Sequence, residues 1–109
     1  MEVEKTIQKL AELERHVRAL DTLIRHVNSM SDEELQKELP RIVKAQRALE
    51  SHGRALTAPR HFVGEFPTPD EKTNSLRELL SRRLWSVKVT MKKATKLFRK
   101  QLADSTYRD

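Results

Sequence analysis

The longest amphipathic segment in the chain is TPDEKTNSLRELLSRRLWSVKVTMKKATKLFRKQLA, residues 68–103. Its apolar residues recur at intervals of three and four, which places them on one side of an α-helix. They are Leu76, Leu80, Leu84, Val87, Met91, Ala94, Phe98 and Leu102. The segment therefore predicts one long helix over residues 69–103.

Capping residues mark the expected start of this helix. The Thr68 side chain can accept a hydrogen bond from the first turn, and Glu71 follows at the spacing of a capping box. Pro69 suits the first helical position, and the carboxylates of Asp70 and Glu71 would face the positive end of the helix dipole. We expect the helix to begin at Pro69.

The opposite side of this helix is strongly basic. Between Leu79 and Ala103 no acidic residue occurs, and eight residues are cationic: Arg82, Arg83, Lys88, Lys92, Lys93, Lys96, Arg99 and Lys100. On a helical wheel, Trp85 and Val89 lie in the middle of the basic side, away from the apolar stripe. This arrangement predicts an interface rather than an ordinary solvated face.

Residues 2–29 predict a first long helix. The residues at its heptad a and d positions are Val3, Leu10, Leu13, Val17, Leu20, Ile24 and Val27, with Ile7 and Leu23 widening the stripe. The pattern suits a coiled-coil seam or one face of a small bundle. On its polar side, Glu14 with Arg18 and Asp21 with Arg25 have the spacing of i,i+4 ion pairs.

A second helix is expected from Asp32. Ser31 and Glu34 have the spacing of a capping box, and Met30 with Leu35 has that of a hydrophobic staple. The short break between the first two helices makes them antiparallel neighbours.

Proline and glycine shape the rest of this second helix. Pro40 removes a backbone hydrogen bond, so we expect either a kink within residues 32–52 or two shorter helices, 32–38 and 40–52. Gly53 is a natural C-terminal cap.

Residues 54–67 predict an irregular connection. Its helix breakers are Pro59, Gly64 and Pro67. Its apolar residues are Phe62, Val63 and Phe66. We expect these apolar residues to close one end of the bundle, with a docking patch as the alternative.

These elements predict an all-α fold in one domain, residues 1–109. The expected architecture is a three-helix up-down-up antiparallel bundle with a kinked second helix and a long basic third helix. The long connection would let the third helix return antiparallel to the second. Residues 104–109 are expected to fray.

Charge is divided unevenly along the chain. Residues 1–53 carry nine basic and ten acidic residues, whereas residues 54–109 carry thirteen and six. This asymmetry favours an anionic partner such as nucleic acid, an acidic protein or a membrane surface. A membrane-surface helix needs a free apolar face, which the bundle would occupy, so we rank that partner third.

Cysteine content and hydropathy bear on the compartment. The chain has no Cys, its N-terminus is mixed in charge without an apolar core segment, and no run approaches the ~20 apolar residues of a membrane span. We therefore expect a soluble, intracellular protein of the cytoplasm or nucleus.

The predicted function is binding. The first hypothesis is a small helical subunit, within a larger complex or an oligomer, that contacts the phosphates of DNA or RNA without sequence specificity. The second is a helical adaptor or assembly protein that docks an acidic protein or self-associates. In the first, Trp85 stacks on bases, and in the second it packs on protein. Both use the residues Arg82, Trp85, Lys88, Val89, Lys92, Lys93, Lys96, Arg99 and Lys100.

No pattern in the sequence predicts an enzyme, a metal site or a cofactor. The two glycines of the chain exclude a conventional Gly-rich phosphate loop, and the acidic residues are explained by helix starts and local pairs. The histidines, His16, His26, His52 and His61, show no metal-ligand spacing. We predict no catalytic residues.

Overall fold

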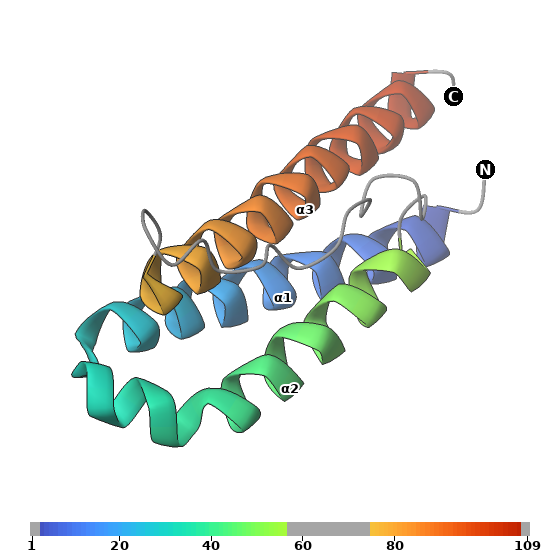
Figure 1. Cartoon of the computed structure of the whole chain (residues 1–109). Helices are drawn as coiled ribbons and strands as arrows, with labels where there is room; N and C mark the ends of the chain where they lie inside the picture. The colour runs from blue at the N-terminus through green and yellow to red at the C-terminus, as the bar shows by residue number, and fades with distance from the viewer. Residues whose placement is uncertain (1–2, 57–74, 108–109) are drawn as a thin grey trace.

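The computed structural model describes residues 3–56 and 75–107 and confirms an all-α fold (Figure 1). Helix α1 covers Val3–Ser29, α2 covers Asp32–Leu56 and α3 covers Leu76–Tyr107. The three helices form a bundle in which α1 packs most extensively against α3. The described part of the chain contains no strand.

The direction of α3 differs from the predicted up-down-up arrangement. Asn28 contacts Ser81 and Glu14 contacts Arg99, so α3 runs antiparallel to α1. Because α2 also runs antiparallel to α1, α2 and α3 are parallel and start at the same end of the bundle (Figure 1). The order is therefore up-down-down.

The length of the connection allows this topology. The 18 residues from 57 to 74 can span up to about 60 Å. The 25-residue α2 is only about 37 Å long. A connection of this length can reach either end of the bundle. Its length therefore does not determine the direction of α3. Residues 57–67 of the predicted connection, which include Phe62, Val63 and Phe66, lie outside the described residues.

Arg77 joins all three helices at the end where α2 and α3 begin. Its Nη1 donates to the carbonyl of Val27 at 2.7 Å, and its Nη2 lies 2.9 Å from Asp32 Oδ1. The last carbonyls of a helix lack intrahelical partners, so this Arg satisfies one of them on α1. The contact also fixes the first turn of α3 against the first turn of α2.

The predicted start of α2 is confirmed. The amide of Glu34 donates to Ser31 Oγ at 3.2 Å, and the Ser31 hydroxyl donates to Glu34 Oε1 at 3.1 Å. Met30 and Leu35 are both buried, as a hydrophobic staple requires.

Helix α2 continues through both of its expected breakers. Pro40 lies inside the helix, and the first, teal part of α2 runs in a different direction from its green remainder (Figure 1). Gly53 is buried within the helix, which ends at Leu56, so the prediction that Gly53 caps it was wrong. One glycine costs a helix only about 1 kcal/mol relative to alanine, which tertiary packing can offset.

The prediction that a continuous helix begins at Pro69 was also wrong. Ser75 is not helical, α3 begins at Leu76, and the Glu78 amide donates to Ser75 Oγ at 3.2 Å. Ser75 and Glu78 have the same spacing as Thr68 and Glu71, and this second box caps the helix. At its other end α3 passes the expected boundary at Ala103 and reaches Tyr107.

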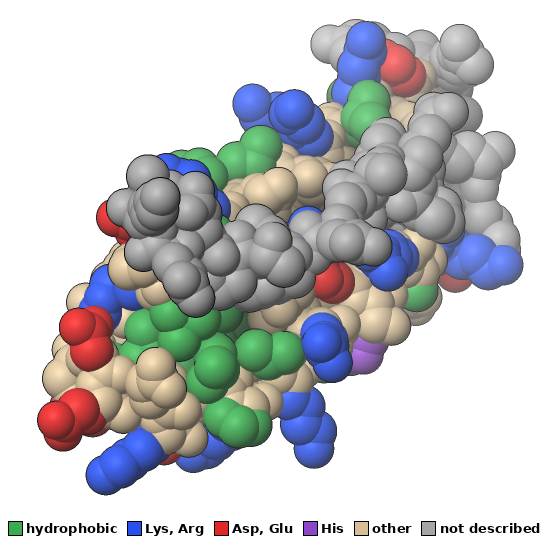
Figure 2. Space-filling model, in the orientation of Figure 1, with side chains coloured by type: hydrophobic (Ala, Val, Ile, Leu, Met, Phe, Trp, Pro, Cys, Tyr) green, Lys and Arg blue, Asp and Glu red, His purple; other side chains and the backbone are tan. Residues whose placement is uncertain are grey.

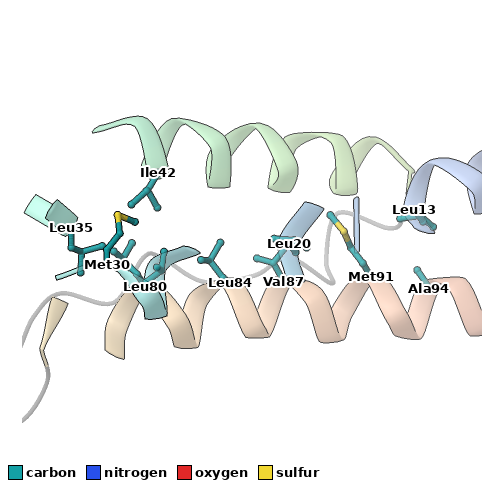
Figure 3. Packing of buried hydrophobic residues seen from close by; sticks show 11 residues of the cluster. Leu13, Leu20, Met30, Leu35, Ile42, Leu80, Leu84, Val87, Met91 and Ala94 are labelled. Carbon is teal, nitrogen blue, oxygen red and sulfur yellow. The ribbon is translucent and has the colours of Figure 1, made fainter. Parts of the chain in front are cut away.

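The core gathers side chains from all three helices, and Figure 3 shows them between the ribbons of α2 and α3. Helix α1 contributes Leu13, Leu20 and Val27 at seven-residue intervals. The residues of α3 in the core are Leu80, Leu84, Val87, Met91 and Ala94, as its apolar stripe predicts. Each fully buried Leu or Met contributes about 1.5–3 kcal/mol of burial free energy. At the start of α1, Val3 and Ile7 are 44% and 52% exposed and lie outside this core.

A second, buried ion pair joins α2 and α3. Arg83 Nε lies 2.6 Å from Glu50 Oε1, and the two side chains are only 12% and 9% exposed. Gln46 of α2 is also buried. Arg83 is therefore an internal cation and does not belong to the exposed basic face of α3.

Candidate nucleic-acid interface

The outward side of α3 presents cations on both sides of a large aromatic ring. Trp85 is 55% exposed and Val89 is half-buried. The exposed cations on this side are Arg82, Lys92, Lys93, Lys96 and Lys100. Along the upper edge of the molecule, over α3, Lys and Arg side chains alternate with hydrophobic ones (Figure 2). The sequence-predicted juxtaposition of Trp85 with basic residues is therefore present at the surface.

These five cations keep their charge available. Within residues 3–56 and 75–107, none of them forms an ion pair. Exposed lysine and arginine heads of this kind can contact phosphates with little desolvation cost. The helix supplies no carboxylate between Glu78 and Asp104 to compete with such a ligand.

Lys88 differs from its neighbours because it is buried. Its Nζ pairs with Asp21 Oδ1 of α1 and lies 4.4 Å from the centroid of the Trp85 ring. The Lys88 side chain is only 11% exposed. A buried cation needs a paired carboxylate, so Lys88 holds α3 against α1 and supports one face of the Trp85 ring. The prediction that Lys88 contacts the ligand directly is corrected to this structural role.

Arg99 also pairs across the α1–α3 interface. Its Nη2 donates to Glu14 Oε1 at 2.6 Å, with the Arg99 side chain 58% exposed. Arg99 therefore lies at the surface, but part of its charge is compensated by Glu14.

Glu14 and Asp21 of α1 thus pair with α3 rather than with the bases four residues later. The predicted Glu14–Arg18 and Asp21–Arg25 ion pairs are absent from the described structure. Arg25 instead donates its Nε to the backbone carbonyl of Asp21 at 3.4 Å. As a consequence, the charge of Arg18 is left without a carboxylate partner among residues 3–56 and 75–107.

Arg18 is the functional candidate that the sequence interpretation missed. It lines a groove between α1 and α3 together with Glu14, Val17, Lys92, Thr95, Lys96 and Arg99. The sequence does contain a signal that Glu14 and Asp21 pair with α3 instead of with Arg18 and Arg25. Glu14 and Asp21 each directly follow a core leucine of α1, which places both acids beside the neighbouring helix.

The structure brings two of the histidines together. The rings of His16 on α1 and His52 on α2 lie with their centroids 5.3 Å apart. Burial lowers the pKa of His16, and the neighbouring His52 and Arg15 lower it further while Glu12 acts in the opposite direction. His61 lies outside the described residues.

Residues 3–56 and 75–107 offer neither a metal site nor a membrane-spanning helix. No group of three or more His, Cys, Asp and Glu residues there could hold a metal ion. None of the helices there combines the length and hydropathy that crossing a membrane requires.

Comparison with protein-family models, curated proteins and solved structures found no match.

Proposed function

We propose that this protein binds nucleic acid without sequence specificity through the outward side of α3, as a small helical subunit of a larger complex or an oligomer. The observation that carries this proposal is Trp85, 55% exposed among five exposed cations. Proteins that hold single strands combine base stacking on aromatic rings with a basic surface that follows the phosphates. The α3 surface offers both, on a helix fixed by the core beneath it.

The charges predict weak specificity and strong salt dependence. The cationic side chains are lysines and one arginine spread along the helix, which suits contacts with phosphates rather than the reading of base edges. Each phosphate contact on a single strand contributes about 0.7 to the slope of log affinity against log salt. Trp85 adds stacking that is independent of the base identity.

Titration of fluorescein-labelled oligonucleotides tests this proposal by anisotropy. The full chain is titrated against single- and double-stranded 20-nucleotide DNA and RNA at several NaCl concentrations. We expect binding that weakens with salt and that is reduced in the double variant Lys93→Gln, Lys100→Gln. Loss of two phosphate contacts should lower the salt slope on single strands by about 1.4.

The matched control is the double variant Lys37→Gln, Lys44→Gln, which removes the same charge from exposed positions of α2. Its affinity should remain close to that of the unmodified chain. Equal losses in the two double variants would show that net charge, not the α3 surface, determines binding. No binding to any oligonucleotide at low salt would overturn the proposal.

A second candidate function is a helical adaptor that docks an acidic protein. The observation that favours it is the exposure of two large apolar side chains of α3, Trp85 at 55% and Leu97 at 52%. Exposed aromatic and aliphatic residues of this size are typical anchors of protein interfaces. An interface anchored in this way would be less sensitive to salt than phosphate binding.

A further inference from the structure

We propose that the groove between α1 and α3 holds a backbone phosphate of the bound strand, with Arg18 of α1 completing the site. This inference rests on the proposed function and extends it from one helix to two. Residues of both helices line the groove: Glu14, Val17 and Arg18 on α1, and Lys92, Thr95, Lys96 and Arg99 on α3.

The charge of the groove suits a phosphate group. Its four cations and one carboxylate give a net charge of +3. The single carboxylate, Glu14, is already engaged by Arg99 at 2.6 Å, which reduces its repulsion of an anion. Lys92, Lys96 and Arg18 have no ion-pair partner within the described ranges.

The exchange of ion-pair partners explains why Arg18 is available. An isolated helix would let Glu14 neutralise Arg18 one turn later. In the folded chain Glu14 pairs with Arg99 instead, so packing of α3 against α1 releases Arg18 to the groove. The phosphate site therefore forms only when the two helices are assembled.

The base of the groove favours ionic contacts. The half-buried Val17 supplies an apolar surface there. The hydroxyl of the buried Thr95 already donates to the Lys92 carbonyl at 2.7 Å. Charge–charge contacts strengthen beside such a low-dielectric surface. A phosphate in the groove should therefore be held by stronger ionic contacts than a phosphate on the open face of α3.

The groove also lies within reach of a strand stacked on Trp85. Lys92 and Lys96 follow Trp85 by seven and eleven residues, or about 10 and 16 Å along the helix axis. One strand can therefore stack a base on Trp85 and place a nearby phosphate in the groove.

Two single variants of the full chain test the inference in opposite directions. In the anisotropy assay with single-stranded 20-nucleotide DNA, Arg18→Gln removes a groove cation and should weaken binding about fivefold at 0.1 M salt. It should also lower the salt slope by about 0.7. Glu14→Gln releases Arg99 and should strengthen binding and increase the slope by a similar amount.

The control variants are Arg15→Gln and Glu12→Gln, which change the same charges on the side of α1 that faces α2. If Arg18→Gln and Arg15→Gln weaken binding equally while the unmodified chain binds, the groove holds no phosphate, and the α3 surface still stands as the binding site. If the unmodified chain binds no oligonucleotide at low salt, this inference and the proposed function fail together. Circular dichroism of each variant checks that helicity is retained.

Discussion

At the scale of single residues, the partial burial of His16, beside His52, makes stability depend on pH. Their ring centroids are 5.3 Å apart, and burial together with His52 lowers the pKa of His16 below 6.5. His16 and His52 line a groove between α1 and α2, and the other charged groups that line it are Glu12 and Arg15. Below neutral pH the unfolded chain therefore binds more protons at His16 than the folded chain.

The contribution of His16 to the free energy of unfolding should accordingly be fully present above pH 6.5. It should be lost as the pH falls from 6.5 through the lowered pKa of His16. Urea unfolding followed by circular dichroism at pH values on both sides of 6.5 measures this loss. His16→Gln should reduce the loss, since the titrating group is absent, whereas His26→Gln, at an exposed position of the same helix, should not. An equal loss in His16→Gln and the unmodified chain would show that His16 does not cause the pH dependence.

Single residues also show what the sequence could and could not predict of the site. The exposure of Trp85 and its basic neighbours follows from helical periodicity, because α3 has one apolar stripe and one opposite side. The burial of Lys88 does not, since it depends on Asp21 approaching from α1. Ion-pair choice between helices depends on their relative position, which periodicity leaves open.

At the scale of elements, capping decides where α3 begins. The sequence contains two possible capping boxes before this helix, at Thr68 and at Ser75. The Ser75 box caps α3, and Thr68 lies outside the described residues. Periodicity defines the apolar side of the helix but carries little information about which of two similar caps is used. The same limit applies to α2, where Gly53 lies inside the helix instead of ending it.

Replacement of the Ser75 cap should therefore be measurable. Ser75→Ala removes the acceptor of the Glu78 amide and should lower the free energy of unfolding by about 1 kcal/mol. Ser86→Ala, at an exposed position within the same helix, should be neutral or slightly stabilising because alanine has the higher helix propensity. Thermal and urea unfolding monitored at 222 nm compares the two. Equal stability of Ser75→Ala and Ser86→Ala would show that Ser75 does not stabilise the helix start.

At the scale of the whole molecule, the topology determines the binding surface. Antiparallel packing of α1 and α3 places the acids Glu14 and Asp21 beside the cations Arg99 and Lys88. These contacts bury Lys88, compensate part of the Arg99 charge and leave Arg18 without a carboxylate partner among the described residues. The helix faces could be predicted from the sequence, but the direction of α3 could not, because a long connection permits either direction.

In the proposed complex, nucleic acid binds on the α3 surface that contains Trp85. The chain has one tryptophan, so its emission reports on this surface alone. The most direct measurement is the Trp85 emission of the unmodified chain during titration with unlabelled single-stranded oligonucleotide at low salt, followed by addition of NaCl. We predict that the strand quenches the emission and that salt restores it, because phosphate contacts hold the base against the ring. Emission that stays unchanged while anisotropy reports binding, or the absence of any binding at low salt, would contradict the claim.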